Sequence, residues 1–205
     1  SYGGQNLHFG IREHGMGAIV AGLAYYGGLV PFGATFFVFT DYMRPPIRLA
    51  ALSHIQAVFV MTHDSIFVGE DGPTHQPVET LATIRAIPNV SVIRPADANE
   101  TAQAWMAALE NKTRPTVLVL SRQDLPVIDR AQCAAASGTR HGAYTLWESA
   151  AGKVPEIILI GTGSEVHLCM EAGKQLAARG RRVRVVSMPS WDRFEEQSQD
   201  RKSVV

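Results

Sequence analysis

The sequence has few cysteines and no excess of charge of either sign. Its two cysteines, Cys133 and Cys169, are too few for a disulfide framework and fit a reducing compartment. The 19 basic residues balance the 19 acidic ones and are dispersed, so no nucleic-acid partner is expected. We expect no membrane-spanning helix, and therefore no membrane partner.

The chain also lacks a secretory signal and an initiating methionine. It starts at Ser1, and its last stretch, residues 192–205, is mostly polar and stops without a closing element. We therefore expect a fragment of a larger protein. Its 205 residues, 46% of them hydrophobic, are enough for one large or two small domains.

The most informative stretch is residues 62–79, THDSIFVGEDGPTHQPVE, which follows the strand-like run AVFVMT. Its glycines and prolines exclude a long helix or a central strand, so we predict an irregular loop that leaves the end of a strand. In open α/β sheets such loops line the ligand crevice. The titratable side chains of this loop are His63, Asp64, Glu70, Asp71, His75 and Glu79.

Two other interpretations of this loop are open. It could be a solvated surface loop with ordinary polar turns, since loops collect polar residues for both reasons. It could also bind a metal ion through His63, Asp64, Asp71 and His75. The spacing of these four residues matches no zinc signature, and mixtures of His and Asp without Cys are unspecific.

Helical and strand-like segments alternate along residues 1–123, which predicts an α/β fold with a parallel sheet flanked by helices. The Pro45-Pro46 pair predicts a break or kink near Arg44 in the second helix, and Asp97 is the expected cap of the fourth. The predicted helices cover residues 15–26, 36–53, 77–86 and 98–110.

The remaining residues predict a linker and a second unit. Residues 124–141 contain a proline, an alanine run and a Ser-Gly pair, which is typical of a linker. Residues 142–205 then predict a partial second α/β domain. Its GTGSEV turn is similar to part of a dinucleotide-binding fingerprint but lacks the third glycine, so we favour a tight strand-to-helix turn with Ser164 as the N-cap.

Three features suggest chemistry. Glu13 begins a helix of small apolar residues, and a carboxylate in such a setting has a raised proton affinity and can hold or donate a proton. Phe36, Phe39 and Tyr42 recur every third residue, as in a core stripe or in a pocket for a flat heterocycle. Histidines and an arginine at the ends of successive strands suit a polyhydroxylated phosphate ester.

Four strings in the first part, GIREHGMGAI, FFVFTDYMR, THDSIFVGEDGPTHQPVE and VLSRQDLP, resemble the pyrimidine-binding domain of the transketolase family. The string from IILIGTGSEVHL to VRVVSMPS resembles the start of the family's C-terminal domain. The resemblance implies a transketolase-like pyrimidine-binding domain over residues 1–123, the linker over 124–141 and a truncated C-terminal domain over 142–205. It implies thiamine diphosphate-dependent transfer of a two-carbon ketol group from a ketose phosphate to an aldose phosphate, as in the pentose phosphate pathway or the Calvin cycle.

The resemblance also implies which residues bind the cofactor. Glu13 matches the glutamate that hydrogen-bonds N1′ of the aminopyrimidine and favours the imino tautomer, whose 4′-nitrogen deprotonates C2 of the thiazolium ring. Phe36, Phe39 and Tyr42 match the aromatic pocket of the pyrimidine, with Phe39 stacking on the ring. His75 matches a histidine near the amino group and the reacting carbon, so Glu13 and His75 are the expected catalytic residues.

Three further matches concern the sugar substrate. His63 and Arg122 match groups that bind the sugar phosphate. Asp71 matches the residue that contacts the C2 hydroxyl. A divalent metal, Mg²⁺ or Ca²⁺, is implied as well, but its ligands belong to an earlier domain with a Gly-Asp-Gly…Asn motif, which this sequence does not contain.

Since the family's site forms between two subunits, the resemblance implies a homodimer, and this chain alone is expected to be inactive. The implied location is the cytoplasm, or the plastid stroma in a photosynthetic eukaryote. Dihydroxyacetone synthase, with a different acceptor, is one alternative, and a non-catalytic truncated paralogue that acts as an interaction protein is another. Deoxyxylulose-phosphate synthase is less similar in the GEDGPTHQPVE and VLSRQ strings.

Overall fold

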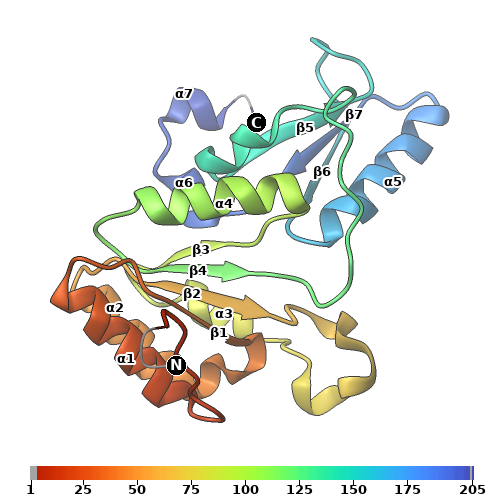
Figure 1. The fold of residues 1–205 in the computed structure, drawn as a ribbon. Helices are drawn as coiled ribbons and strands as arrows, with labels where there is room; N and C mark the ends of the chain where they lie inside the picture. Colours follow the sequence, from red (N-terminus) through yellow and green to blue (C-terminus); the bar gives the residue numbers. More distant parts are fainter. Residues whose placement is uncertain (1–3, 204) are drawn as a thin grey trace.

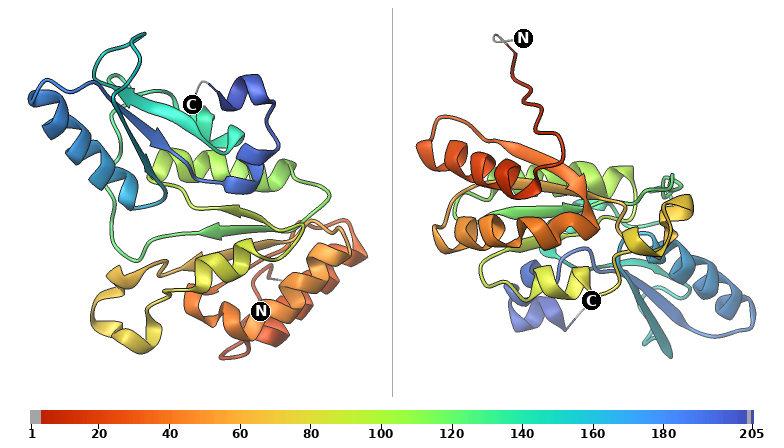
Figure 2. Two further views of the ribbon diagram at one scale, coloured as in Figure 1. Left: turned by 180° about the vertical axis from the view of Figure 1, so that it is seen from behind. Right: turned by 90° about the horizontal axis from the view of Figure 1, so that it is seen from below.

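The computed structural model, which describes residues 4–203 and 205, contains two sheets with helices packed around them (Figures 1 and 2). In the first sheet four parallel strands lie in the order β1-β2-β4-β3, which confirms the predicted parallel sheet. These strands are β1 (Phe32–Phe36), β2 (Val58–Thr62), β3 (Ser91–Ile93) and β4 (Thr116–Val119).

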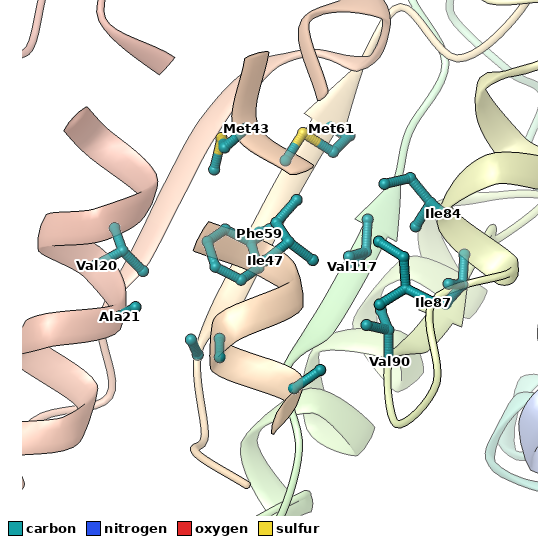
Figure 3. Packing of buried hydrophobic residues seen from close by; sticks show 14 of the residues in the cluster. Val20, Ala21, Met43, Ile47, Phe59, Met61, Ile84, Ile87, Val90 and Val117 are labelled. Atoms are coloured by element: carbon teal, nitrogen blue, oxygen red, sulfur yellow. The ribbon is translucent and has the colours of Figure 1, made fainter. Parts of the chain in front are cut away.

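Helices cover both faces of the first sheet (Figure 1). Alternate residues of β2 point to opposite faces, as the strand period of two requires. Phe59 and Met61 pack under the helices of one face (Figure 3). Val58 and Val60 pack with residues of α4 on the other face. The helices of the first face are α1 (Glu13–Tyr26), α2 (Thr40–Leu52) and α3 (Thr80–Arg85), and α4 (Ala98–Glu110) lies on the other.

The fourth helix begins and ends where the sequence predicts. Asp97 precedes it in an extended conformation, and its side chain accepts a hydrogen bond of 2.8 Å from the backbone N–H of Glu100. This contact satisfies one of the free N–H groups at the helix start, so the predicted cap is confirmed.

The second predicted helix differs from the structure at its start. Phe36 is the last residue of β1, and the single 3₁₀ turn η1 (Phe37–Phe39) separates it from α2. The aromatic residues therefore lie on a strand end, a 3₁₀ turn and a helix start, and not on one α-helix. A short 3₁₀ turn also brings positions three apart to the same side, which the spacing alone could not distinguish from an α-helix.

The predicted break at the proline pair is wrong, because α2 runs through Pro45 and Pro46 to Leu52. Packing against α1 compensates for the two missing N–H donors. Pro46 is buried at Gly17, where an added Cβ would lie 2.9 Å from Pro46 Cγ and 2.8 Å from Met43 Cγ. The glycine lets the proline ring sit against the α1 backbone, so tertiary contacts hold a helix that local propensity disfavours.

The second sheet has the order β5-β7-β6, with β5 antiparallel and β6 parallel to β7. This sheet, with a helix between two of its strands, agrees with the predicted second α/β domain. Ser164 precedes α5, but its hydroxyl lies 3.1 Å from Glu165 Oε1 and caps no backbone N–H, so that part of the prediction is wrong. The elements are β5 (Tyr144–Glu148), β6 (Ile157–Gly161), α5 (Glu165–Ala178), β7 (Val183–Ser187), α6 (Trp191–Glu195) and α7 (Gln199–Lys202).

Residues 124–141 connect the two units and contact both. Ile128 is buried, and its N–H donates to Asp97 Oδ2 over 3.0 Å. Arg130 pairs with the same carboxylate. The segment ends in the 3₁₀ turn η4 (Ala136–His141).

Across the described part of the chain, no helix combines the length and the apolar character needed to cross a membrane.

Candidate functional site

Four rings form a row at the carboxyl edge of the first sheet. The parallel register places Phe36, the end of β1, opposite Thr62, the end of β2, so His63 follows directly beside Phe36. The Phe36 and His63 rings stack with centroids 3.6 Å apart and planes 19° apart. Phe39 lies 6.0 Å from Phe36 in a nearly parallel plane, and Tyr42 lies 6.1 Å from Phe39.

His75 closes one side of this row. Its ring meets Phe39 and Phe36 edge to face, with centroid distances of 5.5 and 6.3 Å. The 3₁₀ turn η3 (Pro73–His75) carries it, and the Thr74 hydroxyl lies 2.8 Å from its Nδ1. Edge-to-face contacts of this kind fix the orientation of a ring, so the loop delivers the histidine to the aromatic row in a defined pose.

His63 has an unusual backbone and a perturbed ring. Its φ of 59° lies in the left-handed region, which residues other than glycine seldom adopt. Its Nε2 lies 4.0 Å from Asp71 Oδ2, at the end of η2 (Ile66–Asp71). Burial lowers the pKa of His63, Asp71 and Asp64 oppose that change, and Arg122 and His75 reinforce it. The ring is therefore more often neutral than a free histidine at the same pH.

Arg122 lies near this cluster but is half exposed. It follows β4 at the same edge of the sheet, and its nearest acidic partner is Glu70, 3.8 Å away. An exposed pair at this distance contributes little stability. The guanidinium is thus available to an anionic ligand, and its charge already reaches His63.

Glu13 differs from the other predicted site residues in having no side-chain partner among the described residues. It is the first residue of α1 and is partly buried, and among the described residues its carboxylate makes no hydrogen bond or ion pair. The structure thus brings together Phe36, Phe39, Tyr42, His63, Asp71 and His75, with Arg122 close by. Glu13 is left with a free carboxylate.

The metal-site interpretation of the loop finds no support. Asp64, one of the four possible ligands, is buried and holds Arg94, with its Oδ2 at 2.7 Å from the Arg94 terminal nitrogen. Among residues 4–203 and 205, no three His, Cys, Asp or Glu side chains are grouped as metal ligands.

The sequence analysis assigned no role to Arg94, which in the structure pairs with Asp64, the residue after His63. Arg94 directly follows β3, and its guanidinium contacts both Asp64 and Glu165, a residue of the second unit. Its position after a strand was the available signal, because His63 and Arg122 follow β2 and β4 at the same edge. Its partners in other segments could not be deduced from spacing.

Two family models match the chain. "Transketolase, pyrimidine binding domain" matches residues 2–127, and "Transketolase-like TK C-terminal domain" matches residues 142–205. A Geobacillus stearothermophilus transketolase is 57% identical over 197 residues, which are 96% of this chain and 29% of that protein. This chain therefore spans less than a third of the length of that curated relative.

Solved structures give the same similarity. A Campylobacter jejuni transketolase matches with a TM-score of 0.90 and 45% identity, over 98% of this chain and 31% of that one. A Pichia stipitis transketolase in complex with sedoheptulose-7-phosphate matches with a TM-score of 0.88 and 45% identity, over 96% of this chain and 28% of that one.

Proposed function

Because this chain belongs to the transketolase family, we propose that it supplies one half of a thiamine diphosphate-dependent active site that transfers a two-carbon ketol group between sugar phosphates. The observation that carries this proposal is the row of Tyr42, Phe39, Phe36 and His63 at the carboxyl edge of a parallel sheet. Ligands of open α/β sheets bind at this edge.

The residues present fit the cofactor's aminopyrimidine. Tyr42 is exposed and Phe39 half-exposed, so the row offers an open aromatic face on which a flat heterocycle can stack. Glu13 has a carboxylate without an internal partner, which suits a proton-sharing contact with a ring nitrogen. His75 is held at the edge of Phe39, where it can donate or accept a proton beside a stacked ring. Bound thiamine diphosphate supplies the nucleophilic carbon that carries the ketol group.

We assign the sugar phosphate to the other end of the row. Arg122 can form a bidentate pair with a phosphate, and a protonated His63 can add a charge-assisted hydrogen bond. Asp71 lies beside His63, where its carboxylate can accept a hydrogen bond from a sugar hydroxyl. The Pichia stipitis relative, solved with sedoheptulose-7-phosphate, supports a phosphorylated sugar as the substrate class.

The second half of the site belongs, in this proposal, to the part of the relatives that this chain does not span. That part holds the diphosphate and its Mg²⁺ or Ca²⁺, and a homodimer brings the two halves together. The exposed large apolar side chains of α1, α2 and the segments beside them fit a subunit interface, because such side chains mark interaction sites where they gather on one face. These side chains are Leu7, Ile11, Tyr25, Tyr26, Leu29, Leu49 and Leu52.

We propose the cytoplasm as the location and the pentose phosphate pathway as the setting. The named curated relative is bacterial, which favours the cytoplasm over the plastid stroma. The proposed domain limits remain 1–123, 124–141 and 142–205. The two family models, matched over residues 2–127 and 142–205, support this division.

A grafted enzyme tests the proposal. We define it as the Geobacillus stearothermophilus transketolase in which this chain replaces the 197 matched residues. With thiamine diphosphate and Mg²⁺, it should transfer a ketol group from a ketose phosphate to an aldose phosphate, measured against the unaltered enzyme. The 205-residue chain alone should show no turnover, because it lacks the partner half. A folded but inactive graft would favour the non-catalytic paralogue instead.

Substitution of Arg122 tests the phosphate assignment. In the grafted enzyme, Arg122→Ala should raise KM for phosphorylated sugars roughly 10-fold to 100-fold, since a hydrogen bond to a charged group contributes about 1.5–3 kcal/mol. Unphosphorylated sugars should be affected little. Arg179→Ala, which removes an exposed arginine beyond α5, is the control and should change neither value. Equal losses for both sugar types would show that Arg122 acts on the fold and not on the phosphate.

A further inference from the structure

Arg94 is the centre of a chain of ion pairs that runs from Glu165 in the second unit to Asp64, the residue after His63. Its Nε and one terminal nitrogen donate to Asp64 Oδ2 over 2.8 and 2.7 Å. The other terminal nitrogen donates to the Thr162 carbonyl over 2.8 Å and to Glu165. Only 5% of the Arg94 side chain and 2% of the Asp64 side chain are exposed. Both charges are therefore held by each other and by the turn before α5.

The GTGSEV turn, which resembles part of a nucleotide-binding motif, is built around this arginine. Gly163 has a φ of 58°, and its N–H donates to the Arg94 carbonyl over 3.1 Å. An added Cβ at Gly163 would lie 2.7 Å from the Arg94 guanidinium carbon. A glycine is thus required for its backbone angle and for the close approach of the arginine. In this chain the space beside the turn is occupied by Arg94.

The contact of Asp64 with Arg94 also restrains His63. It directly follows His63, whose left-handed backbone needs its surroundings to hold it. Fixing the Asp64 side chain on Arg94 holds the peptide after His63 and so keeps the imidazole stacked on Phe36 and next to Asp71. None of these contacts involves a ligand, so the effect on substrate would be indirect.

We infer that Glu165 and Arg94 are positioning residues, through which the second unit sets the orientation of His63 for the sugar phosphate. This inference rests on the proposed function for its substrate. It gives the turn at residues 161–166 an indirect role in substrate binding, which acts through Arg94 and Asp64.

The most direct test is a titration of His63 in the 205-residue chain. Its imidazole signal among the seven histidines is assigned as the one lost in His63→Gln. In Glu165→Gln, Arg94 loses one of its two carboxylate partners, and the less compensated guanidinium should lower the His63 pKa by about 0.5 unit, within the usual spread of histidine values. The other charges that act on His63, namely Asp71, Arg122 and His75, are unchanged.

A matched control separates positioning from general stability. Glu196 also pairs with an arginine of the first unit, Arg114, over 2.6 Å. Neither residue is among the charges that act on His63. Glu196→Gln should leave the His63 pKa unchanged. Arg94→Lys is a second test variant, because lysine keeps the charge but cannot bridge two carboxylates with a planar fork. Because lysine should hold Asp64 less firmly and leave that carboxylate less compensated, the His63 pKa should rise, opposite to its change in Glu165→Gln.

The kinetic arm uses the grafted enzyme. Glu165→Gln should raise KM for a ketose phosphate about threefold to tenfold, less than the loss of a whole charged hydrogen bond, with kcat within about twofold. Glu196→Gln should change neither. If both substitutions give the same His63 pKa and the same KM, the inference is wrong, and a pKa change without a KM change would overturn its functional part. An inactive graft would count against the proposed function alone, because the titration requires no turnover.

Discussion

Replacing Glu13 by glutamine in the grafted enzyme should lower kcat by at least about two orders of magnitude and leave the fold intact. A positioned acid–base group contributes about this much. The glutamine would have the size of the original side chain and could still hydrogen-bond, but it could not exchange a proton with the aminopyrimidine. The structure makes the effect specific, because the Glu13 carboxylate has no partner among the described residues and supports no internal contact.

The alternative role of Glu13 predicts a much smaller effect. As an acidic residue in the first turn of α1, it would interact with the helix dipole, which is worth about 0.3–1 kcal/mol of stability. Urea unfolding of the 205-residue chain measures that contribution separately. Proton exchange at C2 of the cofactor in deuterated water, followed by NMR after an acid quench, reports the catalytic step. Exchange at the unsubstituted rate in Glu13→Gln would refute the proposed role.

Much of this fold follows from local sequence signals. The alternation of apolar runs and helical segments gives the parallel sheet, because its strands are short, apolar and separated by helices. Asp97 identifies the start of α4, since a carboxylate before an apolar helix satisfies its free N–H groups. The parallel sheet then places the ends of β1, β2 and β4 at one edge, which gathers Phe36, His63 and Arg122.

The errors have the opposite origin. Pro45 and Pro46 disfavour a helix locally, but packing of Pro46 on Gly17 holds α2 together. Gly17 lies 29 positions earlier in the sequence (46 − 17), so rules about neighbouring residues cannot predict this contact. Arg94 went unassigned for the same reason, because Asp64 and Glu165 come from distant segments. Local rules predict single helices and strands, whereas the partners of a buried charge depend on which helices and strands pack together.

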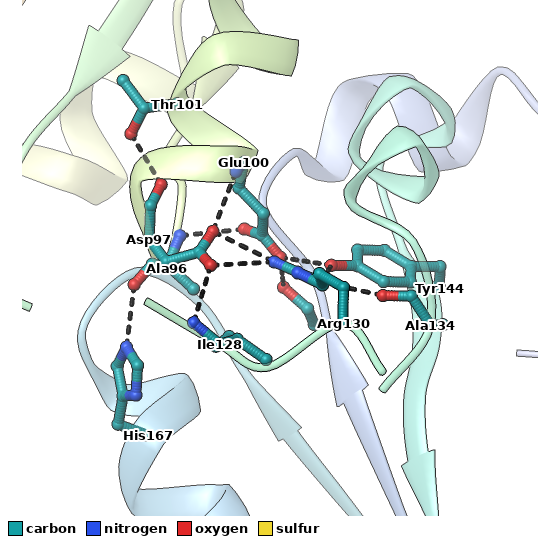
Figure 4. Close-up of polar contacts among 10 residues, drawn as sticks. Ala96, Asp97, Glu100, Thr101, Ile128, Arg130, Ala134, Tyr144 and His167 are labelled. Carbon is teal, nitrogen blue, oxygen red and sulfur yellow. Dashed lines mark hydrogen bonds and ion pairs between the residues drawn. The ribbon is translucent and has the colours of Figure 1, made fainter. Parts of the chain in front are cut away.

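The largest expected effect on stability comes from a second buried network, centred on Asp97. Its side chain is fully buried and accepts four hydrogen bonds, from the N–H groups of Glu100 and Ile128 and from Arg130 to both oxygens (Figure 4). Arg130 in turn donates to the Tyr144 hydroxyl over 2.9 Å. The network therefore connects α4, the segment 124–141 and β5.

Glu100 adds a second buried carboxylate beside it. It accepts hydrogen bonds from the Ala96 N–H, the Tyr144 hydroxyl and the Ser187 hydroxyl over 2.8, 2.6 and 2.7 Å. Burial, and then the negative charge of Glu100, raise the pKa of Tyr144, which keeps its hydroxyl protonated and able to donate. Every oxygen of this carboxylate is thus satisfied, as burial of a charge requires.

Asp97→Ala should destabilise the 205-residue chain by about 3–5 kcal/mol, because it leaves the partly buried Arg130 without its carboxylate and removes the α4 cap. Urea unfolding at neutral pH measures this loss. Glu195→Ala is the matched control. It removes a carboxylate that is 72% exposed and pairs with Lys202 over 3.1 Å, so it should cost no more than about 0.5 kcal/mol.

A double substitution shows whether the unpaired charge is the cause. Asp97→Ala combined with Arg130→Met removes both charges, so it should be more stable than Asp97→Ala alone, since replacing a whole buried ion pair by apolar residues costs less than breaking it. The remaining deficit, about 2–4 kcal/mol, corresponds to the lost cap and to the unpaired N–H of Ile128. If Asp97→Ala were no more destabilising than Glu195→Ala, the network would not hold the two units together. A double substitution less stable than Asp97→Ala would show that Arg130 stabilises the chain through Tyr144 and the Ala134 carbonyl, its other hydrogen-bond partners, and not through Asp97.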